Sequence, residues 1–118
     1  MMTDFLRVAS VSDVPVGASL KVVVNERDIA VVHCADGVFA ISDICSHADV
    51  SLSEGEVIDC TIECWLHGSQ FNLRTGEPLS PPAIFAVPTF EVRLVTESDQ
   101  VFIEVATEPK PVSTDGKQ

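Results

Sequence analysis

Two short segments decide how this chain folds: Cys45-Ser-His47 and Cys64-Trp-Leu-His67, with sixteen residues between them. Each segment carries one cysteine followed by one histidine, so the second repeats the order of the first. Thiolates are soft donors that suit zinc and iron–sulfur clusters, and neutral imidazole suits iron, zinc and copper. The repeat therefore predicts a metal site held by four side chains, Cys45, His47, Cys64 and His67.

Two kinds of metal site use two cysteines and two histidines. Zinc accepts such a set in a closed tetrahedron, but its usual spacing pairs Cys with Cys and His with His. A [2Fe–2S] cluster accepts it when two histidines replace two cysteines on one of the irons. Each segment here mixes the two residue types, which favours the cluster. A zinc-stabilised interaction module remains the alternative from another class.

The two segments resemble the ligand boxes of the Rieske family. The resemblance rests on Cys45-x-His47 and on Cys64-x-x-His67-Gly-Ser69, together with three further turns and loops. These are a Ser-Leu-Ser-Glu-Gly turn between the boxes, an Arg74-Thr-Gly76 turn, and a proline loop at Ser80-Pro-Pro82. The resemblance covers roughly residues 4–105, and a set of this size is much harder to match by chance than a lone motif.

Within that family, the chain resembles the soluble Rieske-type ferredoxins of bacterial ring-hydroxylating dioxygenase systems of the biphenyl and phenylpropionate type. The resemblance implies one [2Fe–2S] cluster per chain, with Cys45 and Cys64 on the inner iron and His47 and His67 on the outer iron. It also implies a one-electron carrier that takes electrons from a flavin-dependent ferredoxin reductase and passes them to a terminal oxygenase. A ferredoxin for another redox system, or for iron–sulfur assembly, is the nearest alternative.

The histidine count indicates that the chain is not itself an oxygenase. A Rieske oxygenase subunit also needs a mononuclear iron held by two histidines and a carboxylate. The chain has three histidines, and only His33 remains once the cluster has taken two. We therefore expect an electron-transfer component of an oxygenase system and no enzyme.

Four positions place the chain within the family. The membrane-complex branch has an additional cysteine in each box, and the two form a disulfide; Val50 and Leu66 stand at the matching positions here. Higher-potential members follow the second box with a serine and a tyrosine that donate hydrogen bonds to the cluster. Here Ser69 keeps the first donor and Phe71 replaces the second. This implies a potential in the lower part of the Rieske range of about −150 to +300 mV.

The remaining sequence predicts an all-β fold. β-Branched and apolar runs, separated by turn residues, indicate strands at 5–8, 20–24, 29–34, 38–42, 92–95 and 101–105. Shorter strands at 57–58, 61–62 and 71–73 are broken by Gly, Ser and Pro. We expect a single Rieske-type antiparallel β-sandwich over 1–107, with a small inserted cluster-binding subdomain at about 43–85. The polar segment 108–118 is expected to be a disordered tail.

Charge and hydropathy limit the partners and the location. A net charge of −11 disfavours nucleic acid and anionic membranes. Eight carboxylates, with no Lys or Arg among them, lie between Arg27 and Arg74, which predicts a negative face that suits a basic docking surface on a partner. The first residues lack the pattern of a signal peptide, and no stretch approaches the roughly 18 apolar residues of a membrane span. We therefore expect a cytoplasmic protein.

Two further cysteines, Cys34 and Cys60, lie outside the ligand boxes. Disulfides are rare in the cytoplasm, and a disulfide pairing of the four cysteines would leave the matching histidine spacings unexplained. Cys34 closes an apolar strand, so we expect it to be a core residue. Cys60 is expected to be partly exposed, and the sequence assigns it no role.

Overall fold

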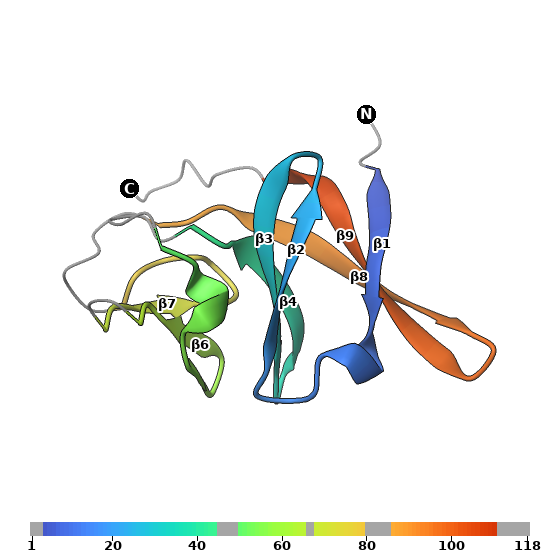
Figure 1. The fold of residues 1–118 in the computed structure, drawn as a ribbon, viewed down its shortest axis with the longest axis horizontal. Coiled ribbons are helices and arrows are strands. Elements are labelled where there is room, and N and C mark those ends of the chain that lie inside the picture. The colour runs from blue at the N-terminus through green and yellow to red at the C-terminus, as the bar shows by residue number, and fades with distance from the viewer. Residues whose placement is uncertain (1–3, 45–49, 66–67, 80–85, 111–118) are drawn as a thin grey trace.

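The computed structural model describes residues 4–44, 50–65, 68–79 and 86–110 (Figure 1). Three of the four predicted ligands, Cys45, His47 and His67, lie outside these ranges, as do Leu66 and the proline loop at 80–82. Within the described ranges, no helix is long and apolar enough to cross a membrane.

Two antiparallel sheets make up the fold. The six-stranded sheet has the order β1-β9-β8-β4-β3-β2, and the three-stranded sheet has the order β5-β6-β7. The large sheet consists of β1 (Phe5–Ser10), β2 (Ser19–Val24), β3 (Arg27–Cys34), β4 (Gly37–Ser42), β8 (Thr89–Glu97) and β9 (Gln100–Pro109). The small sheet consists of β5 (Val57–Ile58), β6 (Thr61–Glu63) and β7 (Gln70–Asn72), and the 3-10 turns are η1 (Val11–Asp13) and η2 (Leu52–Glu54).

The small sheet is an insertion in the large one. The chain leaves the large sheet after β4, builds β5 to β7, and returns at β8, which pairs with β4 through Ala40–Phe90 and Ile41–Thr89. Figure 1 shows the small sheet at one end of the molecule and the β8–β9 hairpin extending at the other. This arrangement confirms the predicted all-β antiparallel fold with an inserted subdomain.

Two long hairpins of the large sheet close with turns of the same kind. Asn25 and Glu26 join β2 to β3 with φ values of 53° and 66°, and Ser98 and Asp99 join β8 to β9 with φ values of 50° and 70°. Positive φ at both central residues is the geometry of a type I′ turn, whose twist matches that of the paired strands. Asn and Asp tolerate this conformation better than most residues, and both turns fall in the gaps between predicted strands, at 25–28 and 96–100.

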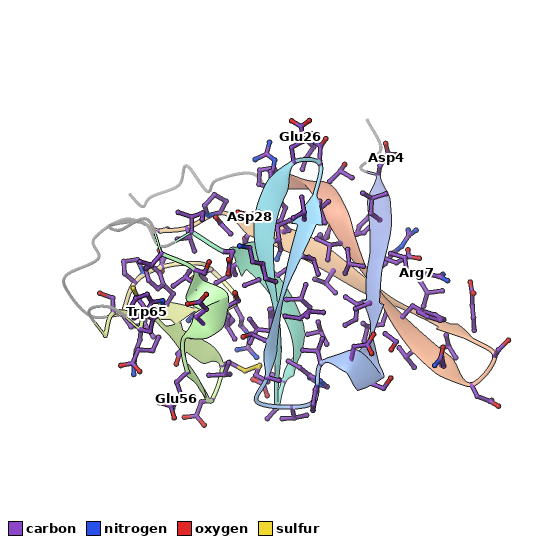
Figure 2. All side chains as sticks on the ribbon, viewed as in Figure 1. Asp4, Arg7, Glu26, Asp28, Glu56 and Trp65 are labelled. Carbon is purple, nitrogen blue, oxygen red and sulfur yellow. A yellow bond between two sulfur atoms is a disulfide. The ribbon has the colours of Figure 1, made fainter. Side chains whose placement is uncertain are left out.

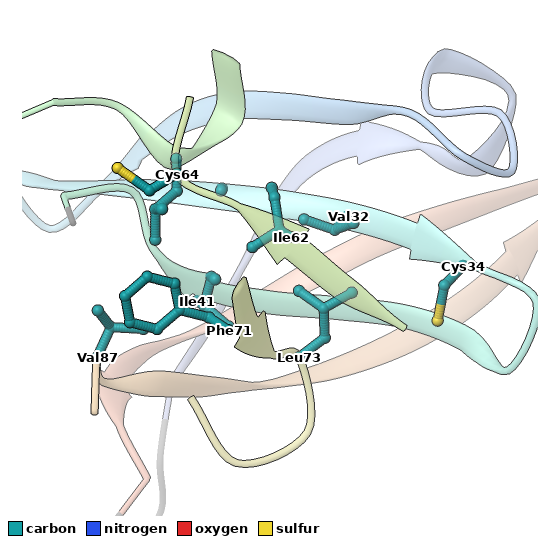
Figure 3. Packing of buried hydrophobic residues seen from close by; sticks show 10 residues of the cluster. Val32, Cys34, Ile41, Ile62, Cys64, Phe71, Leu73 and Val87 are labelled. Carbon is teal, nitrogen blue, oxygen red and sulfur yellow. The ribbon is translucent and has the colours of Figure 1, made fainter. Parts of the chain in front are cut away.

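Strand β3 is buried on both faces and separates two hydrophobic clusters. Ile29 and Val31 pack within the large sheet against residues such as Phe90. Ala30 and Val32 belong to a second cluster, which also contains residues of the small-sheet region: Leu52, Ile62, Cys64, Phe71, Leu73 and Val87 (Figure 3). A strand covered on both faces has a continuous apolar run instead of an alternating one. Strand β3 therefore provides the surface on which the inserted small-sheet region packs.

Strand β9 is longer than the sequence predicts. It continues to Pro109, and the N–H of Lys110 donates a hydrogen bond to the carbonyl of Thr89 at 2.8 Å. The Glu108 carboxylate lies 3.6 Å from the Arg27 guanidinium. Residues 108 and 109, expected in the disordered tail, are thus part of a strand because β8 offers them a pairing partner. Residues 111–118 lie outside the described part of the chain.

A disulfide joins Cys34, the last residue of β3, to Cys60, in the turn between β5 and β6 (Figure 2). The two Cα atoms are 5.4 Å apart. Cys34 is buried, as expected of a core residue, and Cys60 is partly exposed. Neither is a free thiol, which corrects the expectation of one unpaired core cysteine and one cysteine without a role. The two residues meet because the small sheet packs on β3, and their spacing of 26 residues carries no sign of that.

Candidate metal centre

The second ligand box begins where β6 ends. Cys64 is fully buried and is not in a disulfide. Its N–H donates to the carbonyl of Ser69 at 2.7 Å, and its carbonyl accepts from the N–H of Gly68 at 2.7 Å. Gly68 has a φ of 81°, a left-handed conformation that glycine adopts without steric cost. The residues that follow 66–67 are therefore hydrogen-bonded back to Cys64, which precedes them.

The surroundings of the Cys64 thiol are apolar. It belongs to the same cluster as Leu52, Ile62 and Phe71, and Figure 3 shows it at the edge of that cluster. An isolated thiolate is costly to bury among such side chains, whereas coordination to a metal neutralises it. The buried thiol is therefore available as a metal ligand, and a neutral core cysteine would be buried in the same way.

The two segments that flank the first ligand box are hydrogen-bonded to each other. Ile44 pairs with Ser51 in an isolated antiparallel bridge, and the N–H of Leu52 donates to the carbonyl of Asp43 at 2.6 Å. The N–H of Asp43 in turn donates to the carbonyl of Asp28 in β3 at 2.9 Å. Residues 45–49, which carry two predicted ligands, thus connect two ends that are fixed to each other and to the large sheet.

Asp43, in the segment before the first ligand box, has a buried carboxylate. Its side chain is fully buried, and one oxygen accepts a hydrogen bond of 2.7 Å from the N–H of Ser53. The other oxygen has no hydrogen-bond partner among the described residues, and Lys21 Nζ lies 4.0 Å from it. Asp43 therefore does not contribute to a negative surface, contrary to the expectation for the acidic stretch. It fixes the turn that follows the first box.

The described flanks of the two boxes lie against each other. Val50 and Leu52, which follow the first box, pack in the same cluster as Cys64. Gly55, at the end of η2, is so near β6 that a Cβ atom built on it would lie 1.6 Å from the carbonyl oxygen of Glu63. Among the described residues, no group of three or more Cys, His, Asp or Glu side chains could hold a metal; this part of the chain contains one predicted ligand, Cys64.

The ends of the proline loop are tied to β7 and to the turn that follows it. Leu79 N–H donates to the carbonyl of Gln70 at 2.6 Å, and Val87 N–H donates to the carbonyl of Gly76 at 2.8 Å. Gly76 has a φ of 77°, and a Cβ on it would lie 2.1 Å from the Val87 carbonyl oxygen. Only glycine fits such a close approach, which explains why the turn Arg74-Thr-Gly76 ends in glycine.

The end of the molecule that carries the boxes has an acidic and partly apolar surface. Glu54, Glu56 and Asp59 are exposed, while Asp36 is paired with Arg74. Large apolar side chains are also exposed there: Ile44, Ile58, Trp65 (50 %) and Leu79 (54 %). Figure 2 shows Trp65 and Glu56 at this end, away from Arg7. Trp65, between two predicted ligands, is thus half-exposed instead of packed in the core.

The carboxylates with perturbed pKa values lie elsewhere, on β8 and β9 of the large sheet. A hydrogen bond from Arg93 lowers the pKa of Glu104, with a smaller contribution from Arg7. A hydrogen bond from Arg7 lowers the pKa of Glu97. The guanidinium groups of Arg7 and Arg93 also lie 4.4 Å from the ring centres of Phe102 and Phe5, respectively. This network stabilises the β1–β9–β8 edge and does not reach the ligand boxes.

The structure is thus a small all-β domain with an inserted small sheet, and a buried thiol outside any disulfide lies where the sequence predicts the second ligand box. Residues 4–91 match the model of the Rieske [2Fe-2S] domain family. The chain belongs to this family, and its cofactor is a [2Fe–2S] cluster.

Relatives and solved structures agree with this assignment. The chain is 39 % identical to the 3-phenylpropionate/cinnamic acid dioxygenase ferredoxin subunit of Photorhabdus laumondii, over 87 % of this chain and 96 % of the relative. It is 36 % identical to the ferredoxin component of biphenyl 2,3-dioxygenase of Rhodococcus jostii, over 84 % and 91 %. A chain in the solved complex of reduced oxygenase and oxidised ferredoxin in carbazole 1,9a-dioxygenase superposes with a TM-score of 0.79 at 36 % identity, over 91 % and 96 %.

Proposed function

We propose that this protein is a one-electron carrier that passes electrons from a flavin-dependent reductase to the terminal oxygenase of a ring-hydroxylating dioxygenase system. The observation that carries the proposal is the match to ferredoxin components along almost their whole length, 96 % and 91 % in two cases. Those relatives serve dioxygenase systems by name, which favours this role over iron–sulfur assembly. A [2Fe–2S] family also disfavours the zinc-stabilised module.

The proposed ligands are Cys45 and Cys64 on the inner iron and His47 and His67 on the outer iron. When bound, the cluster supplies one-electron chemistry at a potential that neutral imidazoles raise, because they add no negative charge to the reduced state. Cys64 supports this assignment because it lies directly after β6 and is not in a disulfide. Its main-chain hydrogen bonds to Gly68 and Ser69 join the first residue of the second box to the residues that follow the box.

Partners are proposed to dock at the end of the molecule that carries the boxes. Glu54 in η2, Glu56 before β5 and Asp59 in the β5–β6 turn are exposed and would attract a basic surface from a distance. Exposed Trp65 and Leu79 would then be covered on contact, which fits the preference of interfaces for aromatic residues. A carrier fed by a flavin-dependent reductase would work in the cytoplasm, where reduced nicotinamide cofactors are made.

The docking proposal is tested by stopped-flow reduction of the holoprotein by a basic-surfaced reductase, over a series of ionic strengths. The association rate should fall as salt rises, and Glu56→Gln should lower the rate at low salt. Asp99→Asn is the matched control, because Asp99 is an exposed carboxylate at the tip of the β8–β9 hairpin, away from the small sheet. Rates that do not depend on salt, or that fall equally in both variants, would contradict the proposed docking surface.

A further inference from the structure

A covalent bond and an ion pair join the two sheets at the same place. Cys34 ends β3 of the large sheet, and its partner Cys60 lies in the β5–β6 turn of the small sheet. Two residues beyond Cys34, Asp36 is paired with Arg74, which follows β7. The Arg74 guanidinium also lies 5.4 Å from the ring centre of Phe39 in β4. The β3–β4 hairpin is thus fastened to both ends of the small sheet.

Cys60 also lies directly before the second ligand box. Strand β6, residues Thr61–Glu63, is all that separates Cys60 from Cys64. The carbonyl of Cys60 accepts a hydrogen bond of 3.1 Å from the N–H of Leu73, which ties the turn to the chain after β7. A displacement of Cys60 from Cys34 would therefore shift β6, and with it the buried thiol of Cys64.

The two sulfur-bearing residues differ in their exposure. Cys34 is 2 % exposed, whereas Cys60 is partly exposed and follows two exposed residues, Ile58 and Asp59. Exchange of a disulfide needs an attacking thiolate that can reach one of its sulfurs. Cys60 is the more exposed of the two residues, so we assign the attack to its sulfur, and Cys34 is then the leaving thiolate.

We propose that the Cys34–Cys60 disulfide is a site of reversible exchange with a dithiol, and that its oxidised form retains the cluster longer than its reduced form. In the reaction, one dithiol sulfur bonds to Cys60 as the Cys34–Cys60 bond breaks, and Cys34 takes up a proton. The second dithiol sulfur then displaces Cys60, which is also protonated. The protein gains two electrons and two protons, and the dithiol becomes a disulfide. The second half of the proposal rests on the cluster binding proposed above.

The exchange is tested on the native holoprotein with dithiothreitol as the probe, under anaerobic conditions. Samples are quenched in acid, denatured, alkylated and mapped by mass spectrometry. Before treatment, Cys34 and Cys60 should be protected from alkylation, and after treatment both should be labelled. A pair that is already labelled before treatment, or that dithiothreitol opens only in denaturant, would overturn the exchange.

Cluster retention is tested by the rate at which the visible absorption decays in the presence of an iron chelator. The reduced protein should lose its cluster about tenfold faster or more. Removing a cross-link of this kind usually changes the folding equilibrium by at least that factor. Equal rates in the two forms would overturn the proposal that the disulfide helps the protein to retain its cluster. The Cys34→Ser/Cys60→Ser variant should lose its cluster at the fast rate with and without dithiothreitol, which separates the disulfide from any reduction of the cluster itself.

One further measurement, the urea midpoint, keeps the outcomes distinct. If the double variant does not fold, the two redox forms of the native chain still decide the result, because they share one sequence. If the native chain binds no cluster, the proposed function fails instead. The alkylation map then tests the exchange, and the urea midpoints of the oxidised and reduced chain test whether the disulfide stabilises the packing of the small sheet. Equal midpoints would overturn that stabilisation.

Discussion

Gly55→Ala tests whether the flanks of the two ligand boxes pack as closely as the structure shows. Gly55 has φ −87° and ψ 177°, an extended conformation that alanine adopts without strain. A Cβ atom there would lie 1.6 Å from the Glu63 carbonyl oxygen, 2.8 Å from the Glu63 carbonyl carbon and 3.3 Å from the Leu52 carbonyl oxygen. All three are main-chain atoms, so no side-chain rotation relieves the contact.

The size of the effect follows from what must move. To accommodate the methyl group, η2 and β6 must separate by well over one ångström. That separation strains the hydrogen bond from Glu63 N–H to the Glu56 carbonyl, which is 2.9 Å long. It also opens the cluster that contains Leu52 and Cys64. Overpacking usually costs about 1–3 kcal/mol, and we expect the upper end because main chain meets main chain. At roughly 4 °C per kcal/mol for a domain of this size, the melting temperature should fall by about 12 °C.

The assay follows the unfolding of the holoprotein by circular dichroism and the cluster by visible absorption. Gly17→Ala is the matched control: Gly17 has a φ of 91°, but a Cβ there meets nothing within 4 Å. That substitution should cost about 1 kcal/mol from backbone conformation alone, and it should leave the cluster spectrum unchanged. Gly55→Ala should weaken cluster retention as well, because Cys64 follows Glu63 directly. If Gly55→Ala costs no more than Gly17→Ala, the reasoning about close packing is refuted.

Three further predictions concern the cluster and the pH dependence of stability. The purified protein should be red-brown, with about two irons and two acid-labile sulfides per chain, and His47→Cys should lower its potential because an anionic ligand replaces a neutral one; colourless protein with one zinc would contradict this. Ser69 is fully buried, so Ser69→Ala should lower the potential by tens of millivolts if its hydroxyl donates to the cluster, given that a hydrogen bond to a charged group contributes roughly 1.5–3 kcal/mol. Phe71→Tyr should raise the potential; protein-film voltammetry checks both, and Ser10→Ala, a buried serine in β1, should leave it unchanged. The pKa of Glu104 is lowered in the folded state, so its contribution to stability is present above the unfolded pKa and is lost as pH falls through the folded pKa; urea midpoints of Glu104→Gln should therefore depend less on pH in the acid range than those of the native chain.

Much of the protein was accessible from the sequence because the relevant information is local. The ligand types and their order in the two boxes specify the class of metal site, since coordination depends on donor chemistry. The apolar run in β3 indicates a buried strand. The turn residues at 25–26 and 98–99 indicate hairpins, because the backbone conformation of a turn depends on the residues of the turn itself. Even so, the ligand set Cys45, His47, Cys64 and His67 stays a prediction, because three of the four lie outside the described residues.

Other properties depend on which residues the fold brings together. Cys34 and Cys60 form a disulfide because β3 and the β5–β6 turn meet, and Asp43 is buried because the turn after the first box closes over it. Pro109 belongs to β9 because β8 is long enough to pair with it, although its own sequence suggests a tail. Each of these outcomes is set by contacts between segments far apart along the chain, and composition and spacing carry no record of such contacts. The tertiary structure alone therefore decides them.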